Sequence, residues 1–386
     1  MTEATDSRRG PSVEMRGKVC FLVRGLSGGG AQRDAIMLAN GIASRGIACA
    51  VVTLDAEGPL ADLIAPSVDL IDLGRGRKLR MAAAIPALRR FYAGERPDVF
   101  VASEASGNTL AVIAMLMTRP SQRPMIVLRE VASPLQARDN DPYVQNRIAY
   151  RMAPWIYPRA DLVVTLTEAV RRDLMAHFRV PADRVVCLGT NAVMARDDFA
   201  RLETMPKRPE PGLIAAVGRL SPEKDFATLI EAVDIVRNAR PVRLEIAGEG
   251  TGRAALESMI RARGLSDHVT LLGYQNDPAA LLSRAALFVS SSRHEGFGNA
   301  IVEAMAAGVP VVSTDAPYGP REILAGGRWG ALVPVGNVGE LARAIVNALE
   351  SPPDTAGPRL RANDFTAESA AAAFIANIEK RGGRPV

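Results

Sequence analysis

Short apolar segments alternate with helical segments along almost the whole of this 386-residue chain. In the first half the apolar segments lie at 18–23, 48–54, 68–73, 99–102, 125–128, 162–166 and 185–188. Such segments, separated by helices, are typical of parallel β-strands under a helical cover. The first half therefore predicts one doubly wound α/β domain.

The same alternation starts again after a proline-rich stretch at 205–211. Six further strands are expected at 213–217, 243–247, 269–272, 285–289, 309–313 and 331–333. Helices are expected at 225–238, 252–263 and 338–350. The chain is also too long for one ordinary core. We predict an α/β protein with two doubly wound, Rossmann-like domains that face each other across a cleft.

This division predicts four segments. Residues 1–16 are polar and expected to be a disordered tail, and 17–200 would form the first domain. Residues 201–365 would form the second domain, followed at 366–386 by an alanine-rich helix and tail that could pack on either domain. Ligands of doubly wound sheets bind outside the carboxyl ends of the strands, which places the expected site between the two domains.

Composition limits the class of protein. No apolar run is long enough to span a bilayer, no signal peptide is recognised, and the three cysteines match no metal-ligand spacing. A cytoplasmic protein is predicted, with attachment to the inner face of the cell membrane as an alternative. The net charge is +5, with the excess of basic residues in 1–190, but no nucleic-acid motif accompanies it, so no nucleic-acid partner is expected.

The segment 293–303 carries two glutamates separated by seven residues. Glu295 is expected in a loop after a buried strand, with Asn299 as the N-cap of a helix over 300–307 and Glu303 in its first turn. The amides at such a helix start favour an anion such as phosphate. Carboxylates accept hydrogen bonds from hydroxyl groups. The segment therefore predicts a phosphorylated, polyhydroxylated ligand, in outline a sugar nucleotide.

Glycine-rich turns follow several of the predicted strands, where the backbone amides can approach phosphate or sugar. A turn of this kind is a weak signal when taken alone. The residues assigned to donor binding are Gly29, Gly30, Gly218, Gly248, Gly296, Phe297, Gly298, Asn299 and Glu303.

Taken in order, these segments resemble the GT-B glycosyltransferases, specifically glycosyltransferase family 4. Residues 217–225 are similar to the Gly-Arg-Leu…Lys motif of that family, 247–250 to its next loop, and 295–303 to its paired-glutamate motif. Residues 317–324 resemble a loop of members that build bacterial surface polysaccharides. Residues 29–33 are similar to an amino-terminal Gly-Gly-Ala-Glu-Arg motif, with glutamine in place of glutamate.

The resemblance implies roles for four charged residues. Arg219 and Lys224 would stabilise the negative charge of the departing nucleotide. Glu295 would lie near the donor sugar, and these three are the predicted catalytic residues, while Glu303 would hold the ribose hydroxyls. The resemblance further implies a retaining transfer from a nucleotide-diphosphate sugar, expected to be UDP-linked, to a glycan or polyprenyl-linked acceptor. No metal and no other cofactor is expected.

Some readings stay open. The histidine that many family members carry after the strand at 125–128 is absent, and Arg129 or Glu130 could substitute for it. A nucleotide-sugar epimerase and a non-catalytic sugar-nucleotide-binding subunit are the alternatives to transfer. Residues 139–141 spell the Asp-x-Asp signature of metal-dependent enzymes, but they are expected in a polar loop, and chance is the preferred account.

Residues 78–92 mix basic and apolar side chains at roughly helical spacing, and Pro86 interrupts them. They would either contact an anionic membrane surface or form an amphipathic helix that covers the sheet. The sequence favours neither reading.

Overall fold

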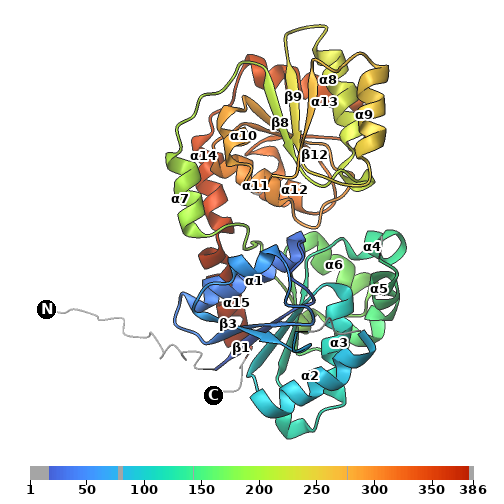
Figure 1. Ribbon diagram of the computed structural model, residues 1–386, viewed down its shortest axis with the longest axis vertical. Coiled ribbons are helices and arrows are strands. Elements are labelled where there is room, and N and C mark those ends of the chain that lie inside the picture. Colours follow the sequence, from blue (N-terminus) through green and yellow to red (C-terminus); the bar gives the residue numbers. More distant parts are fainter. Residues whose placement is uncertain (1–16, 77–80, 142, 276, 382–386) are drawn as a thin grey trace, which may run out of the picture.

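The computed structural model describes residues 17–76, 81–141, 143–275 and 277–381, so the expected tail at 1–16 lies outside the described residues. The chain forms two α/β domains, drawn below and above in Figure 1. Each contains one parallel sheet with helices packed on it, and the predicted fold class is confirmed.

The first domain has seven parallel strands in the order β3-β2-β1-β4-β5-β6-β7. They are β1 (Val19–Val23), β2 (Cys49–Thr53), β3 (Val68–Asp72), β4 (Val99–Ser103), β5 (Met125–Glu130), β6 (Leu162–Thr165) and β7 (Val185–Cys187). All residues of β1, β2 and β4 are buried, as expected for strands covered on both faces. The strand order reverses between β1 and β4, and ligands of such sheets bind at that reversal.

Helices cover both faces of this sheet. Its first face packs against α1 (Gly30–Ala43) and α15 (Ala367–Glu379). The second face packs against α2 (Met81–Glu95), α3 (Ala105–Leu116), α5 (Val144–Ile156) and α6 (Glu168–His177), with α4 (Pro134–Asn140) beside α5. The closing helix α15 therefore belongs to the first domain (Figure 1), and its Phe374 ring lies 6.2 Å from that of Phe21.

The helix α2 runs through Pro86, so the prediction that proline interrupts this segment is wrong. Its apolar side chains Ala84, Leu88 and Tyr92 lie in the core, and this packing holds the helix together where the proline removes one backbone hydrogen bond. The part of the predicted basic segment at 78–80 lies outside the described residues. In the described part, the apolar side covers the sheet.

The second domain has six parallel strands in the order β10-β9-β8-β11-β12-β13. They are β8 (Leu213–Val217), β9 (Arg243–Ala247), β10 (Val269–Gly273), β11 (Leu287–Ser290), β12 (Val311–Thr314) and β13 (Ala331–Val333). One face packs against α8 (Phe226–Val236), α9 (Arg253–Ala262) and α13 (Val338–Glu350). The other packs against α10 (Ala279–Arg284), α11 (Asn299–Ala306), α12 (Gly319–Ile323) and α14 (Ala356–Ala362). Here the strand order reverses between β8 and β11.

The helix α7 (Arg196–Thr204) leads from the first domain to the second. Its Phe199 and Leu202 share a core cluster with Ile301 of α11, so the helix packs on the second domain. A boundary between residues 200 and 201 therefore falls inside a helix. Among the described residues, no helix is both long enough and apolar enough to cross a membrane.

Candidate active site

Two charged side chains meet where the strand order of the second sheet reverses. Lys224 follows β8 and Glu295 follows β11, and these two strands are neighbours in the sheet. The Lys224 ammonium donates to Oε1 of Glu295 at 2.6 Å, and the Ser292 hydroxyl donates to the same oxygen at 2.6 Å. The two residues that the sequence placed in separate motifs therefore form one ion pair.

The backbone around Glu295 is held by the loop after β12. The Glu295 amide donates to the carbonyl of Pro317 at 2.6 Å, and its own carbonyl accepts from the Tyr318 amide at 3.1 Å. The Thr314 hydroxyl donates to the Ser292 carbonyl at 2.6 Å. These bonds fix the carboxylate of Glu295 relative to the sheet.

Glycines allow the neighbouring loops to approach each other closely. A Cβ atom at Gly248 would lie 1.8 Å from the carbonyl oxygen of Gly218, and Gly248 also has a φ of +152°. The loops after β8 and β9 are thus in direct backbone contact. Arg219 is exposed on the first of these loops.

The helix α11 begins at Asn299, and its N-cap is Gly298 with φ 116°, so the predicted asparagine cap is wrong. The reason is tertiary, because the side chain of Asn299 is bonded between the domains: its nitrogen donates to Asp34 at 2.8 Å, and its oxygen, the atom that would cap a helix, accepts from Asn191 at 3.1 Å. The Phe297 ring is buried and packs edge-on against Phe365, at 5.4 Å between ring centroids.

The first domain also contacts this loop through its backbone. A Cβ atom at Gly296 would lie 2.1 Å from the carbonyl oxygen of Val131, which follows β5. Gly296, one of the predicted donor-binding glycines of the second domain, therefore lies against the first domain. Gly29 is the N-cap of α1, with φ 136°.

A buried polar network joins the domains around Asp34. Its carboxylate accepts from the side-chain amides of Asn191 and Asn299, each at 2.8 Å, and Arg129 donates to the Asn191 oxygen at 3.2 Å. Burial raises the pKa of Asp34, which the two amide hydrogen bonds lower in part, and burial lowers the pKa of Arg129 to about 10. Sequence reasoning missed Asp34 and Asn191. A lone acid in the apolar helix α1 was the available signal.

Glu303, the fifth residue of α11, also faces the first domain. Its Oε1 accepts from the Arg33 guanidinium at 3.2 Å, and the Glu303 side chain is 13% exposed. Burial raises the pKa of Glu303, and the Arg33 charge acts against that rise. The carboxylate expected to hold ribose is thus paired with a cation of α1 in this structure.

The reversal point of the first sheet carries an ion pair of its own. Arg24 follows β1 and Glu104 follows β4, and their side chains meet at 2.6 Å. This pair could not be predicted from the sequence, because neither residue lies in a recognised motif.

Arg129 and Glu130, the suggested replacements for the family histidine, are both buried, at 1% and 0% exposure. The two carboxylate oxygens of Glu130 accept from the hydroxyls of Tyr150 and Tyr157 at 2.8 and 2.7 Å. Burial raises the pKa of Glu130. Both side chains are thus engaged within the first domain.

Residues 139–141 do not form the expected loop, because Asp139 and Asn140 end α4, which begins with a proline at its first position. Asp141 accepts from the Tyr143 amide at the start of α5. Within 17–76, 81–141, 143–275 and 277–381, no group of three or more His, Cys, Asp or Glu side chains is placed to hold a metal ion.

The two Rossmann-like domains, each with one parallel sheet, match the architecture of GT-B proteins. Residues 28–190 match the model described as Glycosyltransferase Family 4, and residues 201–363 match the model of Glycosyl transferases group 1. The chain belongs to the family 4-like glycosyltransferases of the GT-B fold.

Curated relatives are similar over part of the chain. One is the N-acetylgalactosamine-N,N'-diacetylbacillosaminyl-diphospho-undecaprenol 4-alpha-N-acetylgalactosaminyltransferase of Campylobacter jejuni, 27% identical over 62% of this chain and 64% of that protein. Another is the alpha-D-kanosaminyltransferase of Streptomyces kanamyceticus, 32% identical over 50% of this chain and 52% of that protein. The chain thus spans less than two thirds of the length of these relatives.

Solved structures share the fold over nearly the whole chain. Sucrose-phosphate synthase from Thermosynechococcus elongatus has a TM-score of 0.76 and 18% identity, over 95% of this chain and 99% of that chain. Anabaena Alr3699/HepE in complex with UDP and glucose has a TM-score of 0.72 and 21% identity, over 94% and 100%. At these identities the likeness shows the fold alone.

Proposed function

We propose that this protein is a retaining, metal-independent glycosyltransferase that moves a sugar from a UDP-linked donor to a glycan or lipid-linked saccharide. The Lys224–Glu295 pair at the strand reversal of the second sheet carries the proposal. Strand reversals are where doubly wound sheets bind nucleotides. The second domain, 201–365, would hold the donor and the first, 17–200, the acceptor.

Arg219 and Lys224 supply positive charge where the diphosphate would leave. Preorganised cations aimed at a developing negative charge are worth roughly 3 kcal/mol of barrier lowering each. Because Lys224 is held by Glu295 at 2.6 Å, its ammonium is positioned before the donor arrives. These two cations would perform the charge neutralisation for which other glycosyltransferases use a metal.

The start of α11 would receive the rest of the donor. The first backbone amides of the helix, which begins at Asn299 after Gly298, would face the diphosphate, as the free amides of a helix N-terminus favour an anion. Glu303 lies one turn further along the helix and would accept hydrogen bonds from the two ribose hydroxyls. Arg33 must release this carboxylate when ribose binds.

Glu295 suits stabilisation of charge better than nucleophilic attack. Its Oε1 accepts from both Lys224 and Ser292, so a proton donor and a cation already engage that oxygen. Retention would then follow from front-face attack. The bond between the anomeric carbon and the phosphate oxygen would break while the acceptor oxygen forms its bond to the same face of that carbon. The leaving phosphate would take the proton of the acceptor hydroxyl. Domain closure would bring the acceptor to the donor.

The acceptor class rests on similarity. The Campylobacter jejuni relative is named for an undecaprenol-linked acceptor, and a polyprenyl-linked saccharide is the acceptor we propose here. A protein that serves such an acceptor works at a membrane surface from the cytoplasmic side.

Calorimetric titration with UDP and with GDP tests the donor site, using Glu303→Ala and Lys224→Ala beside the wild type. Loss of a hydrogen bond to a charged group costs about 1.5 to 3 kcal/mol, so Glu303→Ala should weaken UDP binding roughly 10- to 100-fold. The matched controls are Glu350→Ala and Lys380→Ala, which remove exposed charges at the ends of α13 and α15.

Three further results would decide between functions. Release of UDP from UDP-sugar that depends on an added saccharide acceptor would support transfer, and Lys224→Ala should slow it by about a hundredfold. A new sugar nucleotide formed without acceptor would replace transfer by epimerisation. Donor binding without any turnover across an acceptor panel would favour a non-catalytic binding subunit.

A further inference from the structure

The helix α5 presents an apolar stripe to solvent. Val144, Ile148, Met152 and Trp155 are spaced at four, four and three residues, so they lie on one face of the helix. Their exposed fractions are 54%, 51%, 38% and 58%. The opposite face, with Ala149 and Ala153, is buried in the core. We define these four exposed residues as the α5 stripe.

Basic residues surround the stripe. The helix carries Arg147 and Arg151, Arg159 follows it, and no residue of α5 is acidic. A stripe of this kind, with arginines beside it and a tryptophan at one end, is the pattern of helices that lie in the interfacial plane of a bilayer. The aromatic ring of Trp155 suits the level of the lipid headgroups.

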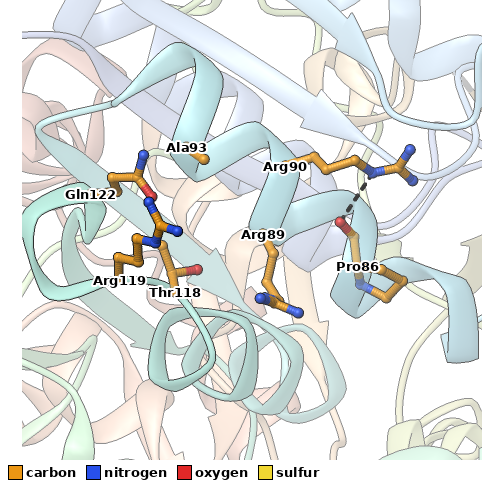
Figure 2. Close-up of a pocket in the computed structure, with 7 residues that line it drawn as sticks. All are labelled: Pro86, Arg89, Arg90, Ala93, Thr118, Arg119 and Gln122. Carbon is orange, nitrogen blue, oxygen red and sulfur yellow. Dashed lines mark hydrogen bonds between the residues drawn. The ribbon is translucent and has the colours of Figure 1, made fainter.

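A basic pocket lies in the same helical layer. It has a volume of about 320 Å³ and is lined by Arg89 and Arg90 of α2 and by Arg119 after α3 (Figure 2). Arg90 donates to the Pro86 carbonyl at 3.3 Å, and Arg89 and Arg119 are exposed. Figure 2 shows the Arg90 side chain turned towards Pro86 and away from Arg119, so the cations of the hollow are Arg89 and Arg119. Two guanidinium groups beside one hollow favour a phosphate-bearing group.

The stripe and the pocket both lie on the solvent side of the helices that cover one side of the first sheet. The helices α2, α3 and α5 share one core cluster against that side, and α3 packs against both of the others. The end of α3 adds two exposed apolar residues, Leu116 and Met117, at 42% and 53%. This layer therefore combines exposed apolar side chains with arginines, and its charge is complementary to an anionic surface.

We propose that the α2–α3–α5 layer docks the first domain on an anionic lipid surface, with the α5 stripe inserted at the headgroup level and the Arg89–Arg119 pocket bound to lipid phosphate. The exposed apolar area, the arginines around it and the absence of acidic residues from α5 together select lipid as the occupant. The docking face lies outside the proposed donor site and can be measured without nucleotide.

Co-sedimentation of the full chain with vesicles tests the proposal, using phosphatidylcholine alone and phosphatidylcholine mixed with phosphatidylglycerol. The wild type should bind the mixed vesicles and lose binding as salt rises. Ile148→Glu should reduce binding about tenfold or more. The matched control is Ile235→Glu, the same change on α8 at the same 51% exposure, which should bind like the wild type.

Tryptophan fluorescence gives a second readout. Trp155 is 58% exposed in the stripe, and the other tryptophan, Trp329, is half-buried in the second domain. Anionic vesicles should shift the emission to the blue in the wild type and leave Trp155→Phe unshifted. Arg89→Ala with Arg119→Ala should weaken binding to mixed vesicles while leaving UDP titration unchanged.

Three results would overturn the proposal. The first is that the wild type binds neither kind of vesicle. The second is an equal loss of binding in Ile148→Glu and Ile235→Glu. The third is wild-type self-association in sedimentation velocity that Ile148→Glu abolishes, because the stripe would then be a contact between two copies of this chain.

Discussion

The guanidinium of Arg33 in α1 donates to the Glu303 carboxylate of α11 at 3.2 Å, across the interface between the two domains. Arg33 lies in the first turn of α1 in the first domain. Glu303 belongs to the second domain and is the carboxylate that we assign to the ribose hydroxyls. A nucleotide that takes Glu303 must compete with Arg33. A donor bound at the proposed site would replace this contact between the two domains.

Removal of Arg33 should therefore strengthen donor binding. A partly exposed ion pair is worth roughly 0.2 to 1 kcal/mol, so Arg33→Ala should bind UDP about 1.5- to 5-fold more tightly. Calorimetry compares it with wild type and with Arg45→Ala, an exposed arginine just past the end of the same helix. Weaker UDP binding in Arg33→Ala would instead assign Arg33 to the diphosphate.

Asp34→Ala should destabilise the folded chain. The change removes the acceptor of two buried hydrogen bonds, from the side-chain nitrogens of Asn191 and Asn299, and hydrogen bonds to a charged group are worth about 1.5 to 3 kcal/mol each. We expect a loss of roughly 3 kcal/mol in the free energy of unfolding by urea. Asp267→Ala, an exposed acid of the second domain, should change it by less than about 0.5 kcal/mol. Equal effects would mean that the network contributes nothing.

Gly248→Ala should destabilise the second domain. The new Cβ would meet the Gly218 carbonyl oxygen at 1.8 Å and would require a left-handed φ, which together cost roughly 2 to 4 kcal/mol. Gly94→Ala is the contrasting change, because this glycine lies inside α2 with nothing within 4 Å of the added Cβ. It should raise stability by about 0.5 to 1 kcal/mol. Thermal unfolding should show a lower melting temperature for Gly248→Ala and a higher one for Gly94→Ala than for the wild type.

The cysteines should resist alkylation in the folded chain. Burial raises the pKa of Cys20 and Cys49 to about 12 and that of Cys187 to about 11. A raised thiol pKa lowers the thiolate fraction at any pH below it, and the thiolate is the reactive form. At pH 8 we expect slow labelling at half-buried Cys187 only, and labelling of all three in urea. Mass spectrometry of the alkylated native chain measures the order of labelling. Labelling of Cys20 or Cys49 before Cys187 would contradict the prediction.

The sequence determined the elements and their order. Fully buried parallel strands must be apolar along their whole length, and helices that cover them must alternate with them, so β1, β2 and α13 lie within the bounds that the pattern predicts. The sequence also predicted close backbone contacts at the motif glycines that follow strands. Where backbone packs against backbone there is no room for a side chain, as at Gly248.

Tertiary structure decided every relation between distant segments. The chain could not reveal that α15 returns to the first domain, since its alanine-rich face would fit either one. Nor could it reveal that Asn299 bonds Asp34 instead of capping α11, or that Lys224 meets Glu295, because 265 and 71 residues separate the partners. Local patterns fix which surface an element buries, whereas the partner of a polar side chain depends on which surfaces the whole fold brings together.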